Sequence, residues 1–164
     1  MSNEVGSKEV VAAGRIVPFH RFRWADFVLP STLQLAPLLE LLVEPVGCEM
    51  TSQKVELGLH EALVNAVRHG NSENPQKQLR VRRILTPNWL IWQVQDEGCG
   101  LPPTARAAEL PLSVDAQHGR GLFLIHQCFD DVRWSRRGNR LQLCLLYTSP
   151  SPRDRSLSRM PSSA

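Results

Sequence analysis

The segment from Thr51 to His69 constrains the fold most, because its apolar residues recur at the spacing of a long amphipathic helix with one buried side. Thr51 or Ser52 is predicted to cap its start, and Gly70 with Asn71 predicts its end. Such a helix needs a second apolar surface to pack against, which the rest of the chain must supply. The apolar stripe consists of Val55, Leu59, Ala62, Leu63, Ala66 and Val67.

The segments before this helix predict one strand and one short helix. Residues 15–24 alternate roughly between apolar and basic side chains, and Pro18 favours an edge position for such a strand. Residues 33–46 have an apolar helical face, with Ser31 as the predicted cap and Pro37 predicting a short or kinked helix. This stretch is shorter than the roughly 20 residues that a membrane-spanning helix needs, so no membrane insertion is predicted.

The segments after the long helix predict strands, turns and one more helix. The turn Thr86-Pro87-Asn88 predicts a hairpin, and an apolar helix is expected from Leu122 to about Phe129. This order of elements predicts an α+β fold, a two-layer sandwich in which a mostly antiparallel sheet carries helices on one face. The predicted strands cover residues 79–85, 89–95, 132–136 and 140–143.

The end of the chain differs in composition from everything before it. Apolar periodicity stops near Tyr147, and from Cys144 the string CLLYTSPSPRD resembles a translated sequencing-library adapter. We therefore predict a flexible N-terminus over residues 1–14, one domain over residues 15–143, and a non-native, disordered tail over residues 144–164. A genuine disordered tail is the alternative.

The charge of the chain does not predict nucleic-acid binding. The formal net charge is +3, and three arginines less one aspartate in the tail contribute +2 of it, leaving +1 for the rest. The N-terminus has no basic start followed by an apolar run, and the four cysteines form no CxxC pair, so a reducing cytoplasm is expected. Seven arginines on predicted strands or turns form either a solvated face or a surface for an acidic partner. They are Arg80, Arg82, Arg83, Arg133, Arg136, Arg137 and Arg140.

Two motifs place polar residues and glycines where a core does not need them. Glu61 and Asn65 lie four residues apart and therefore share one side of the long helix. Asp96, Gly98 and Gly100 follow a predicted strand as DxGxG, and glycines there permit a ligand to approach the backbone closely. Considered separately, each motif also has an ordinary explanation, a solvated helix face or a tight turn.

The third motif precedes the predicted helix that begins at Leu122. Gly119, Arg120 and Gly121 form its GxG sequence, and the free N–H groups at a helix start favour an anion. A single GxG is a weak signal, so the order and spacing of all three motifs decide the interpretation.

Together the three motifs resemble the Bergerat-fold ATP site of the gyrase and histidine-kinase superfamily. The string ELGLHEALVNAVRHGN over residues 56–71 most resembles the bacterial anti-sigma-factor serine/threonine kinases. The resemblance extends over about residues 15–143. One departure lies in the last hairpin, where the family usually has a Gly-Thr pair and Asn139 follows Gly138 here.

The resemblance implies ATP and Mg²⁺ as ligands and a role for each motif. Asn65 would coordinate Mg²⁺ with the phosphates, and Glu61 would be the general base that acts on a substrate serine. Asp96 would accept a hydrogen bond from the adenine amino group, and residues 101–118 would form a mobile lid. The other predicted nucleotide contacts are Gly98, Gly100, Gly119, Arg120, Gly121 and Leu122.

The resemblance also implies a function and partners. The chain would be a cytoplasmic protein serine/threonine kinase that phosphorylates an anti-anti-sigma protein of the STAS type and sequesters an alternative sigma factor. It would act as a homodimer, without direct contact to nucleic acid or membrane. The alternative is an ATP-binding regulatory module without phosphotransfer, and Glu61 argues against it because a pure binder needs no carboxylate beside the magnesium ligand.

Overall fold

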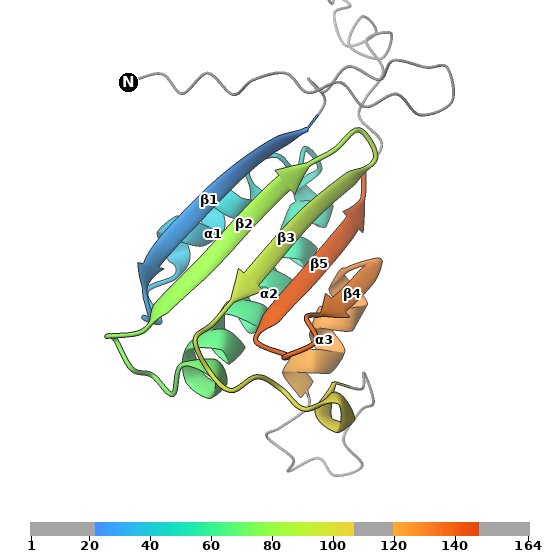
Figure 1. Cartoon of the computed structure of the whole chain (residues 1–164). Helices are drawn as coiled ribbons and strands as arrows, with labels where there is room; N and C mark the ends of the chain where they lie inside the picture. The colour runs from blue at the N-terminus through green and yellow to red at the C-terminus, as the bar shows by residue number, and fades with distance from the viewer. Residues whose placement is uncertain (1–21, 107–119, 148–164) are drawn as a thin grey trace, which may run out of the picture.

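A computed structural model describes residues 22–106 and 120–147 of the chain. They form a five-stranded antiparallel sheet with the strand order β1-β2-β3-β5-β4. All the described α-helices lie behind this sheet in Figure 1, and the face toward the viewer carries none of them. The predicted two-layer α+β sandwich is therefore confirmed. The elements are β1 (Arg23–Pro30), α1 (Ala36–Val43), α2 (Glu49–Asn65), η2 (Ala66–Gly70), β2 (Gln78–Leu85), β3 (Trp89–Gln95), η3 (Pro103–Ala105), α3 (Arg120–Cys128), β4 (Asp131–Trp134) and β5 (Arg140–Leu146).

The hydrophobic core lies between the sheet and the helices. Side chains of β3 alternate between the two faces, so Trp92 is fully buried beneath the helices while Trp89 lies on the open face. The indole N–H of Trp92 donates a hydrogen bond to the backbone oxygen of Leu42 in α1 (3.0 Å). Its ring meets that of Phe129 edge to face, with centroids 5.8 Å apart. Trp92 thus joins the sheet to the segments at both ends of the helical layer.

The long helix continues through a final turn of wider geometry. After α2, the π-helical turn η2 runs from Ala66 to Gly70, and the N–H of Asn71 donates to the oxygen of Ala66, five residues back (2.8 Å). The predicted end at Gly70 and Asn71 is confirmed. No helix in the described part of the chain is both long and apolar enough to span a membrane.

The predicted starts of the first two helices are wrong, and α3 begins at Arg120, two residues before the predicted Leu122. The long helix begins at Glu49 rather than at Thr51 or Ser52, because Cys48 has the extended backbone of a residue that precedes a helix. Helix α1 begins at Ala36, five residues after the predicted cap Ser31. The Ser31 hydroxyl instead accepts a hydrogen bond from the side chain of Asn71. Proline in the first turn of α1 starts this short helix, where its missing N–H needs no partner.

The edge strand lies further along the chain than predicted. It is β1, Arg23–Pro30, and it overlaps the predicted residues 15–24 only at Arg23 and Trp24. Phe27 and Leu29 point toward the helices while Val28 and Trp24 are exposed, so the apolar residues of this strand are divided between both faces and give a weak period-two signal. Residues 15–21 lie outside the described residues.

The last strand is longer than predicted. β5 continues to Leu146, three residues beyond the predicted end at Leu143, and pairs there with Ile91, Leu90 and Trp89 of β3. Cys144 and Leu145 are buried, so their apolar side chains extend the sheet although they belong to the segment set apart as a tail. Residues 1–14 and 148–164 lie outside the described residues.

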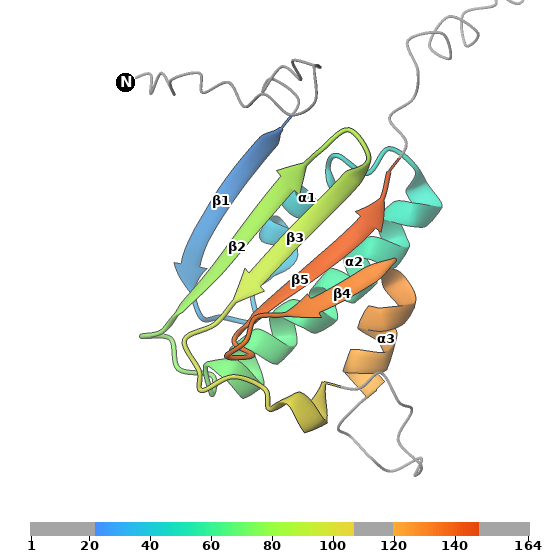
Figure 2. The ribbon, with the colours of Figure 1, turned by 45° about the vertical axis from the view of Figure 1, so that its right-hand side comes forward.

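Helices α2 and α3 approach each other closely at Gly58. A Cβ placed on Gly58 would lie 2.6 Å from the ring of Phe129 and 2.7 Å from the Cβ of Cys128, much closer than atoms can pack. Only glycine fits at this crossing, which holds α3 beside α2 in the helical layer, next to β4 (Figure 2). Because α3 begins beside the polar residues of α2, this contact also positions the functional site.

We predict that Gly58→Ala destabilises the protein by about 1–3 kcal/mol, because overpacking forces the two helices apart. Alanine inside a helix ordinarily stabilises it by roughly 0.5–1 kcal/mol relative to glycine, so a loss would isolate the steric effect. Gly47→Ala is the control, since nothing lies within 4 Å of a Cβ there. Urea unfolding followed by circular dichroism measures both, and equal stability of the two variants would contradict the close crossing.

Candidate functional site

A cleft of about 590 Å³ opens between α2, the start of α3 and one end of the sheet. Its volume lies within the range of roughly 300–1,000 Å³ that is typical of small-molecule sites. The cleft also brings together residues from all three sequence motifs. The predicted site residues that line it are Glu61, Asn65, Asp96, Gly100, Gly121 and Leu122.

Glu61 and Asn65 occupy one wall of the cleft, one turn apart on α2 and both partly exposed. A Cβ placed on Gly121 would lie 2.9 Å from Glu61 Oε2 and 3.4 Å from Asn65 Nδ2, so the first turn of α3 passes directly beside both groups. His60 Nδ1 lies 3.9 Å from Glu61 Oε1 at the exposed rim. A carboxylate and an amide thus lie next to a helix N-terminus, whose partial positive charge attracts anions.

Asp96 lines the cleft beside Gly70, where η2 ends, and is held by its neighbours. Its Oδ1 accepts the N–H of Gly98 (2.7 Å), and its own N–H donates to the backbone oxygen of Asn139 (3.0 Å). The Asn139 side chain returns a hydrogen bond to the backbone oxygen of Asp96 (3.2 Å). Asn139, which follows Gly138 in the last hairpin, therefore holds the backbone of this aspartate in place.

Burial raises the pKa of the Asp96 carboxyl above its ordinary value, because removal from water disfavours the charged form. The hydrogen bond from Gly98 and the charges of Lys77 and Arg137 oppose this rise. The carboxyl group is thus partly desolvated and aligned before any ligand arrives, as expected of a hydrogen-bond acceptor for a ligand.

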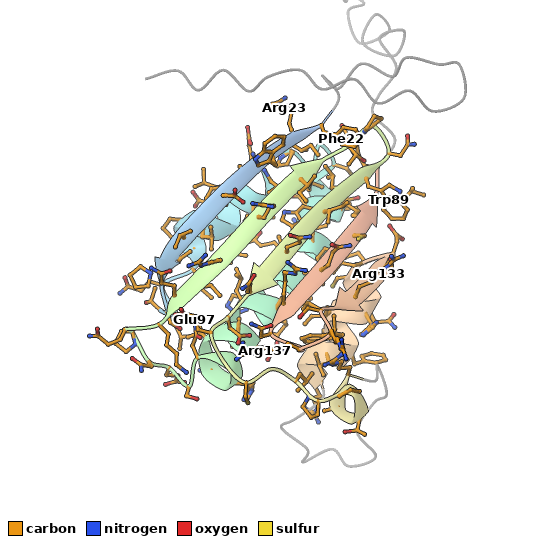
Figure 3. The ribbon with its side chains drawn as sticks, in the orientation of Figure 1. Phe22, Arg23, Trp89, Glu97, Arg133 and Arg137 are labelled. Carbon is orange, nitrogen blue, oxygen red and sulfur yellow. The ribbon has the colours of Figure 1, made fainter. Side chains whose placement is uncertain are left out.

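Two glycines with left-handed backbones close this end of the cleft. Gly100 has φ +90° and Gly138 has φ +83°, a region that side chains strongly disfavour. The N–H of Leu101 donates to the oxygen of Gly138 (3.0 Å), and the Arg106 Nε donates to the oxygen of Leu101 (2.8 Å). The turn after β3 and the β4–β5 hairpin therefore pack backbone against backbone, near the labelled Glu97 and Arg137 in Figure 3.

Some predicted residues lie elsewhere. Gly98 is buried against the backbone of Gly70 and does not line the cleft, so it supports Asp96 and the packing of η2 rather than facing a ligand. Arg120 is exposed at the first position of α3 and is not among the residues that line the cleft. Gly119 and most of the predicted lid, residues 107–118, lie outside the described residues.

Asn71 supports the site from behind the cleft, although the sequence indicated it only as a helix stop. It is completely buried, and its Nδ2 donates to Ser31 Oγ (3.2 Å) and to the backbone oxygen of Gln78 (3.1 Å). Its Oδ1 accepts the N–H of Glu97 (2.8 Å). Asn71 therefore ties the end of the long helix to two strand ends and to the turn that carries Asp96. A polar amide directly after a helix-ending glycine was the available signal.

Trp134 is a second residue that sequence reasoning missed. It faces Leu141 across the β4–β5 ladder, and Leu141 faces Val94 on β3, so these side chains form an apolar floor beneath the cleft. The Trp134 Nε1 is buried and has no hydrogen-bond partner within the described structure. The sequence predicted that Trp134 lies in a strand. It did not predict that the Trp134 side chain lines the cleft.

The comparisons with known proteins agree with this geometry. The family model described as histidine kinase-like ATPase domain matches residues 36–145 of the 164-residue chain. The match spans α1 to β5 and thus contains every described residue that lines the cleft. No curated protein matches the sequence.

We predict that Asn71→Ala destabilises the protein by about 2 kcal/mol or more, because it leaves several buried donors and acceptors without partners. Asn74→Ala is the matched control, since Asn74 is exposed and its side chain accepts only the N–H of Gln76. Thermal and urea unfolding compare the two. A loss at Asn71 no larger than that at Asn74 would show that the buried amide does not hold the site together.

We predict that Asp96→Asn stabilises the unliganded protein at neutral pH by about 1 kcal/mol or less, because it removes a partly desolvated charge. The raised pKa means that the folded wild type binds a proton more readily than the unfolded chain does. Wild-type stability therefore falls as pH rises from the ordinary value of 3.8 through the raised pKa, and the advantage of the variant disappears below 3.8. Melting temperatures across this pH range provide the measurement.

The control for this pH effect is Asp26→Asn, for which the opposite sign is expected. The hydrogen bonds from Arg82 lower the pKa of Asp26, so loss of its charge removes a favourable interaction at neutral pH. A decrease in stability for both variants would contradict the environment assigned to Asp96.

Proposed function

Because the chain belongs to the histidine kinase-like ATPase domain family, we propose that it is an ATP-dependent serine/threonine protein kinase that acts as an anti-sigma factor. The observation that carries this proposal is the position of Glu61, one turn from Asn65 and beside the first turn of α3. A carboxylate at that place is suited to act on a hydroxyl group that approaches the terminal phosphate.

The residues of the cleft fit ATP with Mg²⁺. Asp96 would accept the adenine amino group, the apolar floor that includes Leu141 would lie against the base, and the start of α3 would face the phosphates. Among the described residues, no group of three or more His, Cys, Asp or Glu side chains could hold a metal ion. Asn65 would therefore supply one oxygen ligand, with phosphates and waters as the others, which suits Mg²⁺. The bound ion would neutralise phosphate charge.

The proposed phosphoryl transfer needs one proton acceptor and alignment of the substrate serine with the γ-phosphate of ATP. Glu61 accepts the proton of the substrate serine while the serine oxygen forms a bond to the γ-phosphorus. The bond between this phosphorus and the bridging oxygen of ADP breaks, and ADP leaves with that electron pair. Most of the rate acceleration comes from positioning and charge stabilisation rather than from the base. The rigid α2 wall, held by Asn71 and by the contact at Gly58, provides this positioning.

The proposed partners follow from the resemblance of residues 56–71 to the anti-sigma-factor kinases. The substrate is an anti-anti-sigma protein of the STAS type, and the sequestered partner is an alternative sigma factor. The kinase acts as a homodimer in the cytoplasm, and the bound nucleotide biases which partner it holds. If the protein binds ATP but transfers no phosphoryl group, the alternative function, an ATP-binding regulatory module, applies instead.

We predict that Glu61→Gln lowers phosphotransfer by about 100-fold or more while ATP affinity changes little, because only the proton acceptor is lost. Asn65→Ala is expected to abolish the magnesium dependence of ATP binding. Transfer from γ-labelled ATP to a purified STAS-type protein and equilibrium binding of ATP measure the two effects separately.

Glu56→Gln is the matched control, since Glu56 is an exposed acid on the same helix and its change removes the same charge. Full transfer by Glu61→Gln would exclude its role as base. ATP binding by the wild type without transfer to any STAS-type protein would favour the regulatory module. Failure to bind ATP would contradict the nucleotide site itself.

A further inference from the structure

The open face of the sheet carries a hollow of about 250 Å³ that plays no part in the proposed nucleotide site. We call it the basic hollow and define it by the polar side chains that line it on this face. They are Asp26, Arg80, Arg82, Gln93, Gln95 and Arg140. Figures 1 and 3 look directly onto this face, which none of the described helices covers.

Strand register fixes how the arginines of the hollow are spaced. Arg80 of β2 lies opposite Gln95 of β3, and Gln95 lies opposite Arg140 of β5, so the three side chains form one row across the sheet. Their neighbours Val81 and Leu141 are buried on the helix side, which places the row on the open face. Arg80 and Arg140 are two strand spacings apart, about 10 Å at their backbones.

Two of these arginines have no acidic partner within the described part of the chain. Asp26 accepts two hydrogen bonds from Arg82 (2.6 and 3.0 Å) and so neutralises that guanidinium. No acidic side chain among the described residues forms an ion pair with Arg80 or Arg140, and the Arg80 guanidinium instead donates to the Gln78 side chain (3.1 Å). The hollow therefore presents two uncompensated guanidinium groups, whose planar donors match carboxylates.

Only some of the seven arginines that the sequence grouped together belong to the basic hollow. Arg83 points to the helix side, where it donates to the backbone oxygen of Leu41 and pairs with Glu44. Arg133 pairs with Asp131 at the far edge of the sheet. The uncompensated charge on strands facing the open side is thus concentrated at Arg80 and Arg140.

Apolar side chains adjoin the charge on the same face. Val28, at the rim of the hollow, is 59% exposed, and Trp24, four positions earlier on the same face of β1, is equally exposed. A surface that combines exposed apolar groups with guanidinium groups is typical of a protein interface, where an apolar contact excludes water from charged pairs. Nucleic-acid binding would instead be expected to rest on a broad excess of positive charge, and the chain has a formal net charge of only +3.

We infer that the basic hollow docks an acidic segment of a partner protein, with carboxylates on Arg80 and Arg140 and an apolar side chain on Val28. The inference does not depend on the proposed kinase activity, because the hollow and the nucleotide cleft lie on opposite faces of the sheet. Gln95, between the two arginines, supplies an amide that hydrogen-bonds to the docked segment.

The test measures binding of a fluorescein-labelled decaglutamate peptide to the full chain by fluorescence anisotropy. The variant R80Q/R140Q is expected to weaken binding by about tenfold or more, because both carboxylate contacts are lost. The control R23Q/K54Q removes the same charge away from the hollow and is expected to change binding by less than about twofold. Melting temperatures establish that both variants are folded.

Two further measurements test where the peptide binds and whether the hollow prefers an acidic protein segment to a nucleic acid. The side-chain Nε–H signals of Arg80 and Arg140 in nuclear magnetic resonance spectra should shift with added peptide. Equal weakening by both variants, or no binding to the wild type, would overturn the inference. Displacement of the peptide by an oligothymidylate of equal charge at the same or lower concentration would also overturn it, because it would assign the hollow to nucleic acid.

Discussion

The buried amide of Asn71 is the interaction on which the arrangement of the cleft depends. It lies between the end of the helix that carries Glu61 and Asn65 and the turn that carries Asp96, and it bonds to both sides of that junction. A buried amide must satisfy its donors and acceptor, so only a narrow set of positions is possible for the segments around it. Without it, the helix end, the strand ends and the turn would lose their shared hydrogen-bond partner, and buried polar groups would be left unpaired.

The cleft combines this fixed frame with a charge that the unliganded fold does not favour. Asp96 is partly desolvated, and the glycines at positions 100 and 138 adopt backbones that other residues avoid. Both features lower the stability of the empty protein relative to what an apolar end of the sheet would give. They also hold a hydrogen-bond acceptor in place before a ligand arrives, so binding loses less conformational entropy in ordering the site.

Much of this could be predicted from the sequence, and the failures have physical causes. The long helix, the β2–β3 hairpin and the order of elements follow from periodicity, because buried faces repeat at fixed spacing. Glu61, Asn65, Asp96 and Gly121 were selected because the order and spacing of their motifs resemble a known ATP site, and the structure places all four in one cleft. Asn71 and Trp134 were missed because their roles depend on which distant strands they contact, and the position of β1 was missed because an edge strand is only half covered.

The period-two alternation of the sheet explains how one thin domain carries two independent surfaces. Leu141 points into the cleft and Arg140, the residue before it, lines the basic hollow, so adjacent residues of β5 serve opposite faces. A change at Arg140 removes a charge from the open face while the inward side chain and the ladder to β3 stay in place. The basic hollow and the cleft therefore share strand backbones but no lining side chain, so substitutions on one face test one surface at a time.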